Sequence, residues 1–127
     1  MGNLISGNGS AGIRIDDAGT SGNYVRQNRI GTDTQGLQRI SNGNEGIVIS
    51  GGAKANIVDE RNLISGNLFG LVINGSCTDS NRVSGNWVWL DTTGTDTLPN
   101  LLHGLRIESG ARRNVVGGDG PESRNII

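Results

Sequence analysis

The sequence predicts an all-β fold, a right-handed three-sided parallel β-helix, and three observations support this prediction. The chain repeats with a period of 58 residues, a shorter phrase recurs inside each unit, and every half-unit carries three strand-like phrases in the same order. A fixed period of this kind is typical of a solenoid. Matching positions of the two units include Gly12 and Gly70, Ile15 and Ile73, Asn28 and Asn86, and Asp33 and Asp91.

The first strand of each turn is predicted at a Gly-(Ile/Leu)-x-Ile phrase. The phrase occupies residues 12-15, 46-49, 70-73 and 104-107. Successive side chains of a strand point to opposite faces, so the two aliphatic positions of each phrase share one face. We expect two inward ladders, formed by Ile13, Ile47, Leu71 and Leu105 and by Ile15, Ile49, Ile73 and Ile107.

The second and third strands each follow an asparagine. The predicted second-strand ladder is Val25, Val58, Val83 and Val116, and the third-strand ladder is Ile5, Ile30, Ile64, Val88 and Ile127. Equivalent residues of successive turns should stack at about 4.8 Å. The asparagines then lie at the corners, where a side-chain amide can donate and accept along the stack.

These phrases describe a single domain over residues 1-127. It contains about four turns of the coil, which we call rungs, and a partial one. Two 58-residue units of two rungs each cover about 12-69 and 70-127. Residues 1-11 form the end of a preceding rung. An apolar fraction of 33% suffices for a narrow solenoid, and a net charge of -1 argues against disorder and against a nucleic-acid partner.

The phrases Asn3-Leu4-Ile5-Ser6-Gly7-Asn8 and 62-67, followed by Gly-Ile-x-Ile and Asn-x-Val, resemble the right-handed parallel β-helix repeat family. More narrowly, they resemble the repeat arrays of bacterial secreted or surface proteins. The resemblance implies an extracellular or cell-surface location, although no signal peptide or membrane span is visible in the chain. It implies little about activity, because this scaffold carries enzymes, tailspikes, adhesins and structural arrays.

The sequence indicates no catalytic site, metal site or cofactor, and we expect no enzymatic activity. Asp16-Asp17 and Asp59-Glu60 are adjacent pairs whose members point to opposite faces of a strand. The polygalacturonase-type Asn-x-Asp, Asp-Asp and Gly-x-x-His set is not found in order. His103 is the only histidine of the sequence. Cys77 is the only cysteine, so the chain cannot form an intramolecular disulfide.

Two long connections, at about 32-45 and 90-103, follow the third strand of alternate rungs and should project from one corner. They could form a binding site, or they could fold back over the outer surface of the third face through Leu37, Ile40, Leu98, Leu101 and Leu102. Asp33 and Asp91 precede a threonine in each connection and are expected to form Asx turns in preference to binding Ca²⁺.

The outer surface of the third face is predicted to carry an apolar patch of Leu4, Leu63, Trp87, Trp89 and Ile126. Tryptophans on a flat β-surface can stack against sugar rings. The alternative is that the patch is buried under the long connections or against a second chain.

These observations leave two functions open. The first is a structural or interaction module related to a larger secreted or surface array. It would form a homo-oligomer through uncapped ends or through the outer third-strand face, with Leu4, Leu63, Trp87, Ile126 and Ile127 as contacts. The second is a carbohydrate-binding or polysaccharide-processing domain that uses Trp87, Trp89, Asp33, Asp91 and Asp96.

Overall fold

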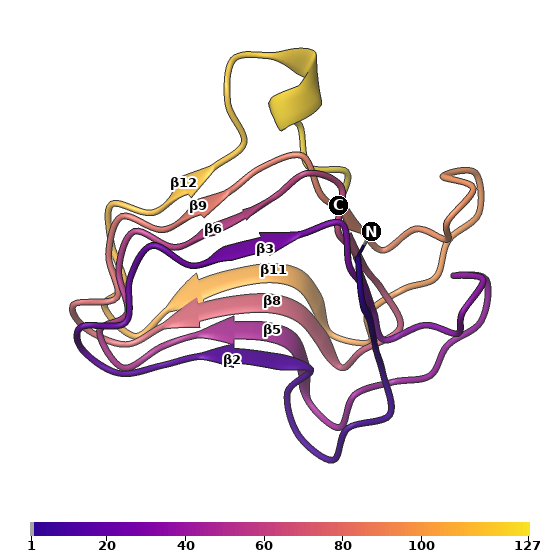
Figure 1. Ribbon diagram of the computed structural model, residues 1–127, viewed down its shortest axis with the longest axis horizontal. Coiled ribbons are helices and arrows are strands. Elements are labelled where there is room, and N and C mark those ends of the chain that lie inside the picture. Colours follow the sequence, from indigo (N-terminus) through magenta and orange to yellow (C-terminus); the bar gives the residue numbers. More distant parts are fainter. Residues whose placement is uncertain (1) are drawn as a thin grey trace.

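A computed structural model describes residues 2–127, which coil into a three-sided parallel solenoid (Figure 1). Each side is a four-stranded parallel sheet. The first face contains β2 (Ile13–Ile15), β5 (Glu45–Ile49), β8 (Phe69–Asn74) and β11 (His103–Glu108). The second contains β3 (Tyr24–Arg26), β6 (Ile57–Asp59), β9 (Arg82–Val83) and β12 (Val115–Val116), and the third β1 (Leu4–Ile5), β4 (Arg29–Ile30), β7 (Leu63–Ile64) and β10 (Trp87–Val88).

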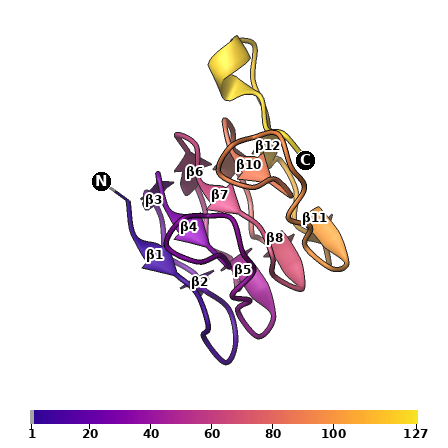
Figure 2. The ribbon, with the colours of Figure 1, turned by 90° about the vertical axis from the view of Figure 1, so that its right-hand side faces the viewer.

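The strand register confirms the predicted inward ladders. On the first face Ile47 pairs with Ile13 and Leu71, and Leu71 pairs with Leu105. The valine ladder of the second face and the third-face ladder from Ile5 to Val88 also pair as predicted. Figure 2 shows the strands following one another from the N-terminal to the C-terminal end of the solenoid.

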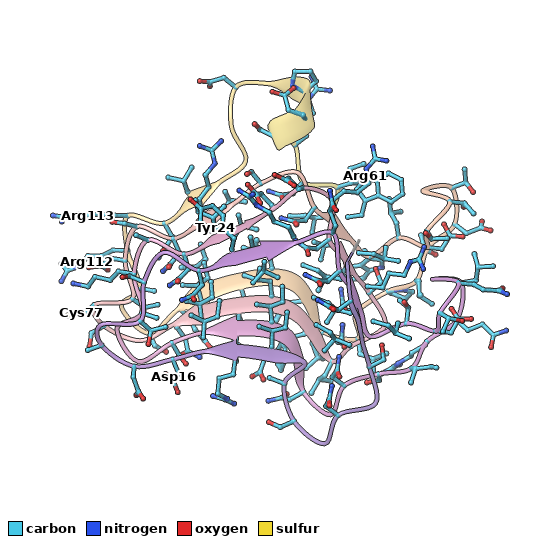
Figure 3. The ribbon with its side chains drawn as sticks, viewed as in Figure 1. Asp16, Tyr24, Arg61, Cys77, Arg112 and Arg113 are labelled. Atoms are coloured by element: carbon cyan, nitrogen blue, oxygen red, sulfur yellow. The ribbon has the colours of Figure 1, made fainter. Side chains whose placement is uncertain are left out.

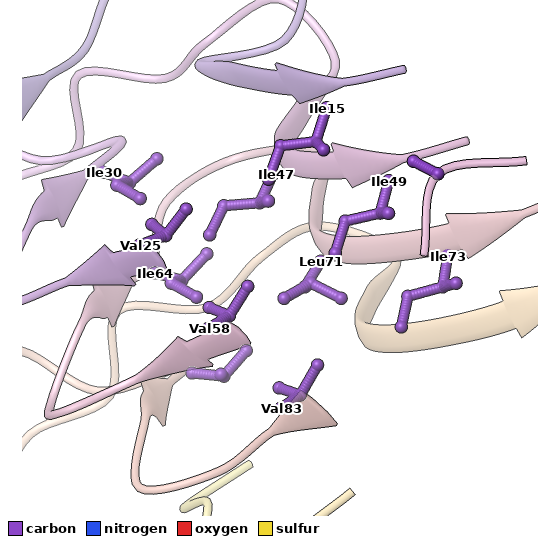
Figure 4. Close-up of a cluster of buried hydrophobic side chains, with 12 residues drawn as sticks. Ile15, Val25, Ile30, Ile47, Ile49, Val58, Ile64, Leu71, Ile73 and Val83 are labelled. Carbon is purple, nitrogen blue, oxygen red and sulfur yellow. The ribbon is translucent and has the colours of Figure 1, made fainter. Parts of the chain in front are cut away.

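The core is one aliphatic layer per face (Figure 4). Side chains of the middle rungs are completely buried, among them Ile47, Ile64 and Leu71. The last rung differs, because Ile107 is 39% exposed, Val116 43% and Ile127 58%. Burial of the ladders therefore decreases toward the C-terminal end of the solenoid.

Three asparagine ladders, one at each corner, connect the rungs. In each ladder the backbone N–H and the side-chain Nδ2 of one asparagine both donate to the Oδ1 of the asparagine in the next rung. Asn28 does this to Asn62 at 3.0 Å for both bonds. The ladders are Asn3, Asn28, Asn62, Asn86 and Asn125; Asn8, Asn42, Asn67 and Asn100; and Asn23, Asn56, Asn81 and Asn114.

The glycine that begins each of the first three first-strand phrases, Gly12, Gly46 and Gly70, is required by close approach to these ladders. A Cβ on Gly46 would lie 2.8 Å from the Asn67 amide nitrogen and 2.7 Å from the carbonyl oxygen of Gly70. No side chain fits there without moving the corner. The recurrence of Gly-(Ile/Leu)-x-Ile thus has a steric cause.

Outside the coil, residues 117-124 form an extension that carries a short 3₁₀ helix, η1 (Pro121–Ser123). It projects beyond β12 in Figure 1 and contains no buried residue in its helical turn. No helix in residues 2–127 has the length and apolarity needed to cross a membrane.

The ladders lead to a prediction at Asn62, whose Nδ2 donates to the carbonyls of Val25 (2.9 Å) and Asp59 (2.8 Å) and to Oδ1 of Asn86 (2.8 Å). The Asn62→Asp variant replaces this donor by an oxygen in a fully buried position. We expect urea denaturation to show a loss of about 3 kcal/mol or more in the free energy of unfolding. The Gln35→Glu variant, the same chemical change on an exposed loop, should lose little, and equal stability of both variants would contradict the role assigned to the ladder.

Candidate functional site

A long depression runs along the corner between the second and third faces, and we call it the axial groove. Its volume is about 1720 Å³. Third-face side chains line it from Leu4 through Arg29, Leu63 and Trp87 to Ile126, and second-face residues such as Asp59 and Arg82 form its other wall. Thr34 and Thr92 of the long connections and residues 121-125 border it. The groove therefore extends across every rung of the solenoid.

The outward ladder of the third face is less uniform than predicted. Leu4, Arg29, Leu63, Trp87 and Ile126 stack in register. Leu63 is buried and Trp87 half-buried, whereas Leu4 and Ile126 are 46% and 45% exposed. Arg29 interrupts the apolar row. In the sequence Arg29 directly precedes Ile30, which points inward, so Arg29 must point outward. The sequence analysis overlooked this signal.

The two long connections lie side by side over this ladder, as predicted from their common corner (Figure 1). The Thr92 N–H donates to the Gly36 carbonyl at 2.9 Å. Cβ atoms built on Gly36 and Gly94 would lie 3.0 Å from Leu63 Cδ2 and 2.9 Å from the Trp87 ring. The predicted covering of the third face is therefore present, and glycines make the close contacts.

The apolar residues expected to cover the face do not do so. Leu37, Ile40, Leu101 and Leu102 are each about half exposed, and Leu98 is only half-buried. Because the backbone of the glycine tips approaches the ladder so closely, no space remains for larger side chains between them. The prediction was right about the loops and wrong about which residues make the contact.

Trp89 does not share the outer face with Trp87, and this prediction was wrong. The chain turns at Trp89 with a φ of 100°, as it does at the equivalent Gly31 with 91°. The turn removes Trp89 from the strand alternation. Its ring instead lies near Gly104 and lines a smaller pocket of about 330 Å³ with Leu90, Thr97, Ile126 and Ile127. The last two of these residues also line the axial groove, whereas Trp89 does not.

The carboxylates of the long connections serve the loops themselves. Asp33 accepts hydrogen bonds from the N–H groups of Leu37 (2.8 Å) and Gln38 (3.1 Å). Asp91 accepts one from the Thr93 hydroxyl (2.6 Å) and one from the Gly94 N–H (3.0 Å). Asp91 also accepts the N–H of Thr93, two residues on, at 3.0 Å, which confirms the predicted Asx turn there. At Asp33 the prediction was wrong, because this carboxylate accepts N–H groups four and five residues on and closes the loop without an Asx turn.

These hydrogen bonds lower the pKa of both carboxyl groups from the ordinary 3.8, chiefly through the Leu37 N–H at Asp33 and the Thr93 hydroxyl at Asp91. Burial opposes the change at both residues. Asp96 is exposed, and its carbonyl, not its carboxylate, accepts the N–H of Asp91. The three aspartates therefore do not converge on a common ligand position.

The remaining reactive side chains also have structural surroundings. Asp16 accepts the Ser50 hydroxyl at 2.9 Å, and His103 is exposed, with its ring 5.9 Å from that of Phe69. Cys77 is an exposed free thiol at the corner that also carries Asp16 (Figure 3). Within residues 2–127 no group of three His, Cys, Asp or Glu could hold a metal ion.

The charges of the axial groove are distributed unevenly. Arg26 binds both neighbouring carboxylates, Asp59 at 2.9 Å and Glu60 at 3.3 Å. Arg61 places its guanidinium 5.0 Å from the centre of the Trp87 ring. Arg29 donates to the Thr34 carbonyl at 2.6 Å, and Arg82 to the Ser84 hydroxyl at 3.3 Å. These arginines are dispersed in the sequence, and the coil brings them to one corner of the solenoid.

No protein-family model matches the chain, and no curated protein or solved structure matches it either. The family resemblance stays a prediction. A functional interpretation therefore rests on the geometry of the groove and of the terminal rungs.

The hydrogen bonds to Asp33 and Asp91 lead to a prediction of pH dependence. Since the folded-state pKa of Asp33 and Asp91 lies below the unfolded value of about 3.9, their stabilisation is fully present above that pH and is lost as the pH falls through the folded value. Urea denaturation at about pH 5 and pH 3 should show a smaller acid-induced loss of stability in Asp33→Asn/Asp91→Asn than in the unmodified protein. The Asp119→Asn variant, changed at an exposed residue outside both loops, should behave like the unmodified protein. An undiminished loss in the double variant would contradict this assignment.

Proposed function

We propose that this protein is a structural and interaction module whose C-terminal rung associates with a second copy of the chain. The exposed inward ladder of that rung carries the proposal. Ile107, Val116 and Ile127 occupy positions whose counterparts in the middle rungs are completely buried. Covering them would bury apolar area and extend the three sheets.

The N-terminal rung of a second copy suits this surface. Its inward residues Ile13, Ile15 and Val25 belong to the same ladders, and placing β2 above β11 would continue the alternation of short and long connections. Asn3-Leu4-Ile5 and Asn125-Ile126-Ile127 occupy the same position in the coil, as members of one asparagine ladder. One of these segments must therefore move aside in a stacked pair. This requirement lowers the stability of the stacked pair.

We test this proposal with the Ile107→Lys variant, which places a charge on the exposed C-terminal rung. Light scattering over a range of protein concentrations should show association of the unmodified chain and a marked loss of association in the variant. The Leu37→Lys variant makes the same change at a residue 45% exposed on a long connection, and it should associate normally. A strictly monomeric unmodified chain at high concentration would refute the proposal.

A second candidate function is polysaccharide binding in the axial groove. It is favoured by the shape of the groove, which crosses all rungs and carries the half-buried Trp87 between the long connections and the 117-124 extension. An elongated polymer could lie along such a surface, since clefts with a few polar groups are common ligand sites.

Calorimetric titration with a panel of acidic and neutral oligosaccharides tests this second function. At least one class should bind saturably, and Trp87→Phe should weaken that binding because it shortens the aromatic surface and disturbs Arg61. Trp89→Phe, changed at a tryptophan that does not line the axial groove, should leave binding intact. Absence of binding by a folded protein with every class would exclude this function.

A further inference from the structure

Two short segments of the chain belong to the same position of the coil. Residues 125-127, which we call the C-terminal segment, lie beside β10, and residues 3-5, the N-terminal segment, lie beside β4. Both have the order asparagine, aliphatic residue, isoleucine, and Leu4 and Ile126 belong to one outward ladder. When β2 of a second copy lies on β11, the two segments therefore compete for the place beside β10.

The C-terminal segment is held beside β10 by hydrogen bonds to the preceding rung. The Asn125 Oδ1 accepts the N–H and the Nδ2 of Asn86, both at 3.1 Å, and the Asn125 Nδ2 donates to the Val83 carbonyl at 2.9 Å. The Ile126 N–H donates to the Asn86 carbonyl at 2.9 Å, and the Ile126 carbonyl accepts the Val88 N–H at 2.7 Å. These bonds define the groups that a replacing strand must offer.

The backbone of the N-terminal segment of a second copy offers the same groups. Within one copy, the carbonyls of Asn3 and Ile5 accept the N–H groups of Arg29 and Gly31, at 2.8 and 3.0 Å. Successive residues of a strand direct their backbone groups to alternate sides, so the N–H and carbonyl of Leu4 point away from β4. These two groups can replace the N–H and carbonyl of Ile126 beside β10.

The side chain of Asn3 also fits the place of Asn125. The Asn3 N–H and Nδ2 donate to the Asn28 Oδ1 at 3.0 and 3.1 Å, and within residues 2–127 no group donates to the Asn3 Oδ1. Asn62, in an inner rung, accepts from the preceding asparagine and donates to a carbonyl of the preceding rung as well as to the next asparagine. Asn3 of a second copy can do the same, so the exchange retains the hydrogen bonds of Asn86.

The attachment of the C-terminal segment allows it to move aside. Eight residues, 117-124, connect β12 to Asn125, whereas the equivalent connection from β9 to Asn86 contains two. The longer connection contains three glycines and no buried residue. Ile127, at the end of the segment, is 58% exposed. The segment can therefore leave β10 while β12 stays in the coil.

The N-terminal segment is held more firmly in its own copy. Ile5 packs against the core, and the hydroxyl of Ser6 donates to the Thr32 carbonyl at 2.7 Å. The Asn8 Nδ2 donates to the Asn42 Oδ1 at 2.8 Å. The chain continues from these residues directly into β2. The N-terminal segment therefore remains part of its own solenoid during association.

We propose that the C-terminal segment blocks the association site until the N-terminal segment of a second copy displaces it. The inference rests on the first proposed function and adds what controls its contact. Because the hydrogen bonds are replaced one for one, burial of Ile107 and Val116 under the second copy drives the exchange. Each copy carries one displacing segment and one blocked site, so the contact is head-to-tail and repeats from copy to copy.

The same substitution at two equivalent positions tests the inference, because the exchange predicts opposite effects. Proline has no N–H and is tolerated in an edge strand where that N–H faces away from the sheet. Leu4→Pro removes the donor that the Asn86 carbonyl of the other copy requires, and association should weaken by at least about tenfold. Ile126→Pro releases the C-terminal segment, and association should strengthen by at least about tenfold. Analytical ultracentrifugation over a range of protein concentrations measures both effects.

The matched controls are Leu4→Ala and Ile126→Ala, which shorten the same side chains and keep the N–H groups. Both should associate nearly as the unmodified chain does, and circular dichroism should show that all four variants fold. Amide hydrogen exchange of the unmodified chain gives a readout that needs no variant. On association the Ile126 N–H should lose protection and the Leu4 N–H should gain it.

The other outcomes separate this inference from the first proposed function. Association of the unmodified chain with no effect of either proline, or with weaker association of Ile126→Pro, would overturn the exchange alone. Alanine variants that behave like the proline variants would also overturn it, because the backbone bonds would then not matter. Association of Ile126→Pro alone would support the exchange and refute association of the unmodified chain. Monomers in every case would overturn both.

Discussion

The hydrogen bond from one corner asparagine to the next is the interaction on which the solenoid depends. At every corner the chain turns from one face to the next, so backbone groups leave the strand ladder and need other partners. In the second ladder, Asn67 meets this need by donating to the Ile30 and Ser65 carbonyls while its own N–H and Nδ2 bond the Oδ1 of Asn100. The same side chain thus closes the corner and determines the register of the next rung.

This constraint explains why many polar residues of the chain have no role in chemistry. Fully buried asparagines form the corners, and the Asp33 and Asp91 carboxylates hold the long connections. Buried polar groups are costly unless they are hydrogen-bonded, and here their bonds are local and structural. A ligand must therefore be recognised by side chains that point outward from the strands or extend from the corners.

The two proposed functions use different parts of the surface. The terminal rung exposes aliphatic residues and unpaired strand edges, a surface for another β-rung. The axial groove, along the side of the solenoid, exposes guanidinium groups and one half-buried tryptophan. The two surfaces meet only at Ile127, so a chain stacked at its end could still bind a polymer along its side, and variants of each surface away from Ile127 can be tested independently.

The sequence by itself determined the fold, the strand ladders and the corner positions, because a period that repeats an aliphatic residue in every rung is compatible with only one stacking register. It also predicted the Asx turn at Asp91, since an aspartate accepts the N–H group two residues away. Only the tertiary structure decided the site. The bend at Trp89 removes that ring from the outer face, and glycine tips rather than leucines cover Leu63 and Trp87. Arginines dispersed in sequence meet at one corner, because proximity across rungs depends on loop lengths and side-chain direction, which a linear pattern does not specify.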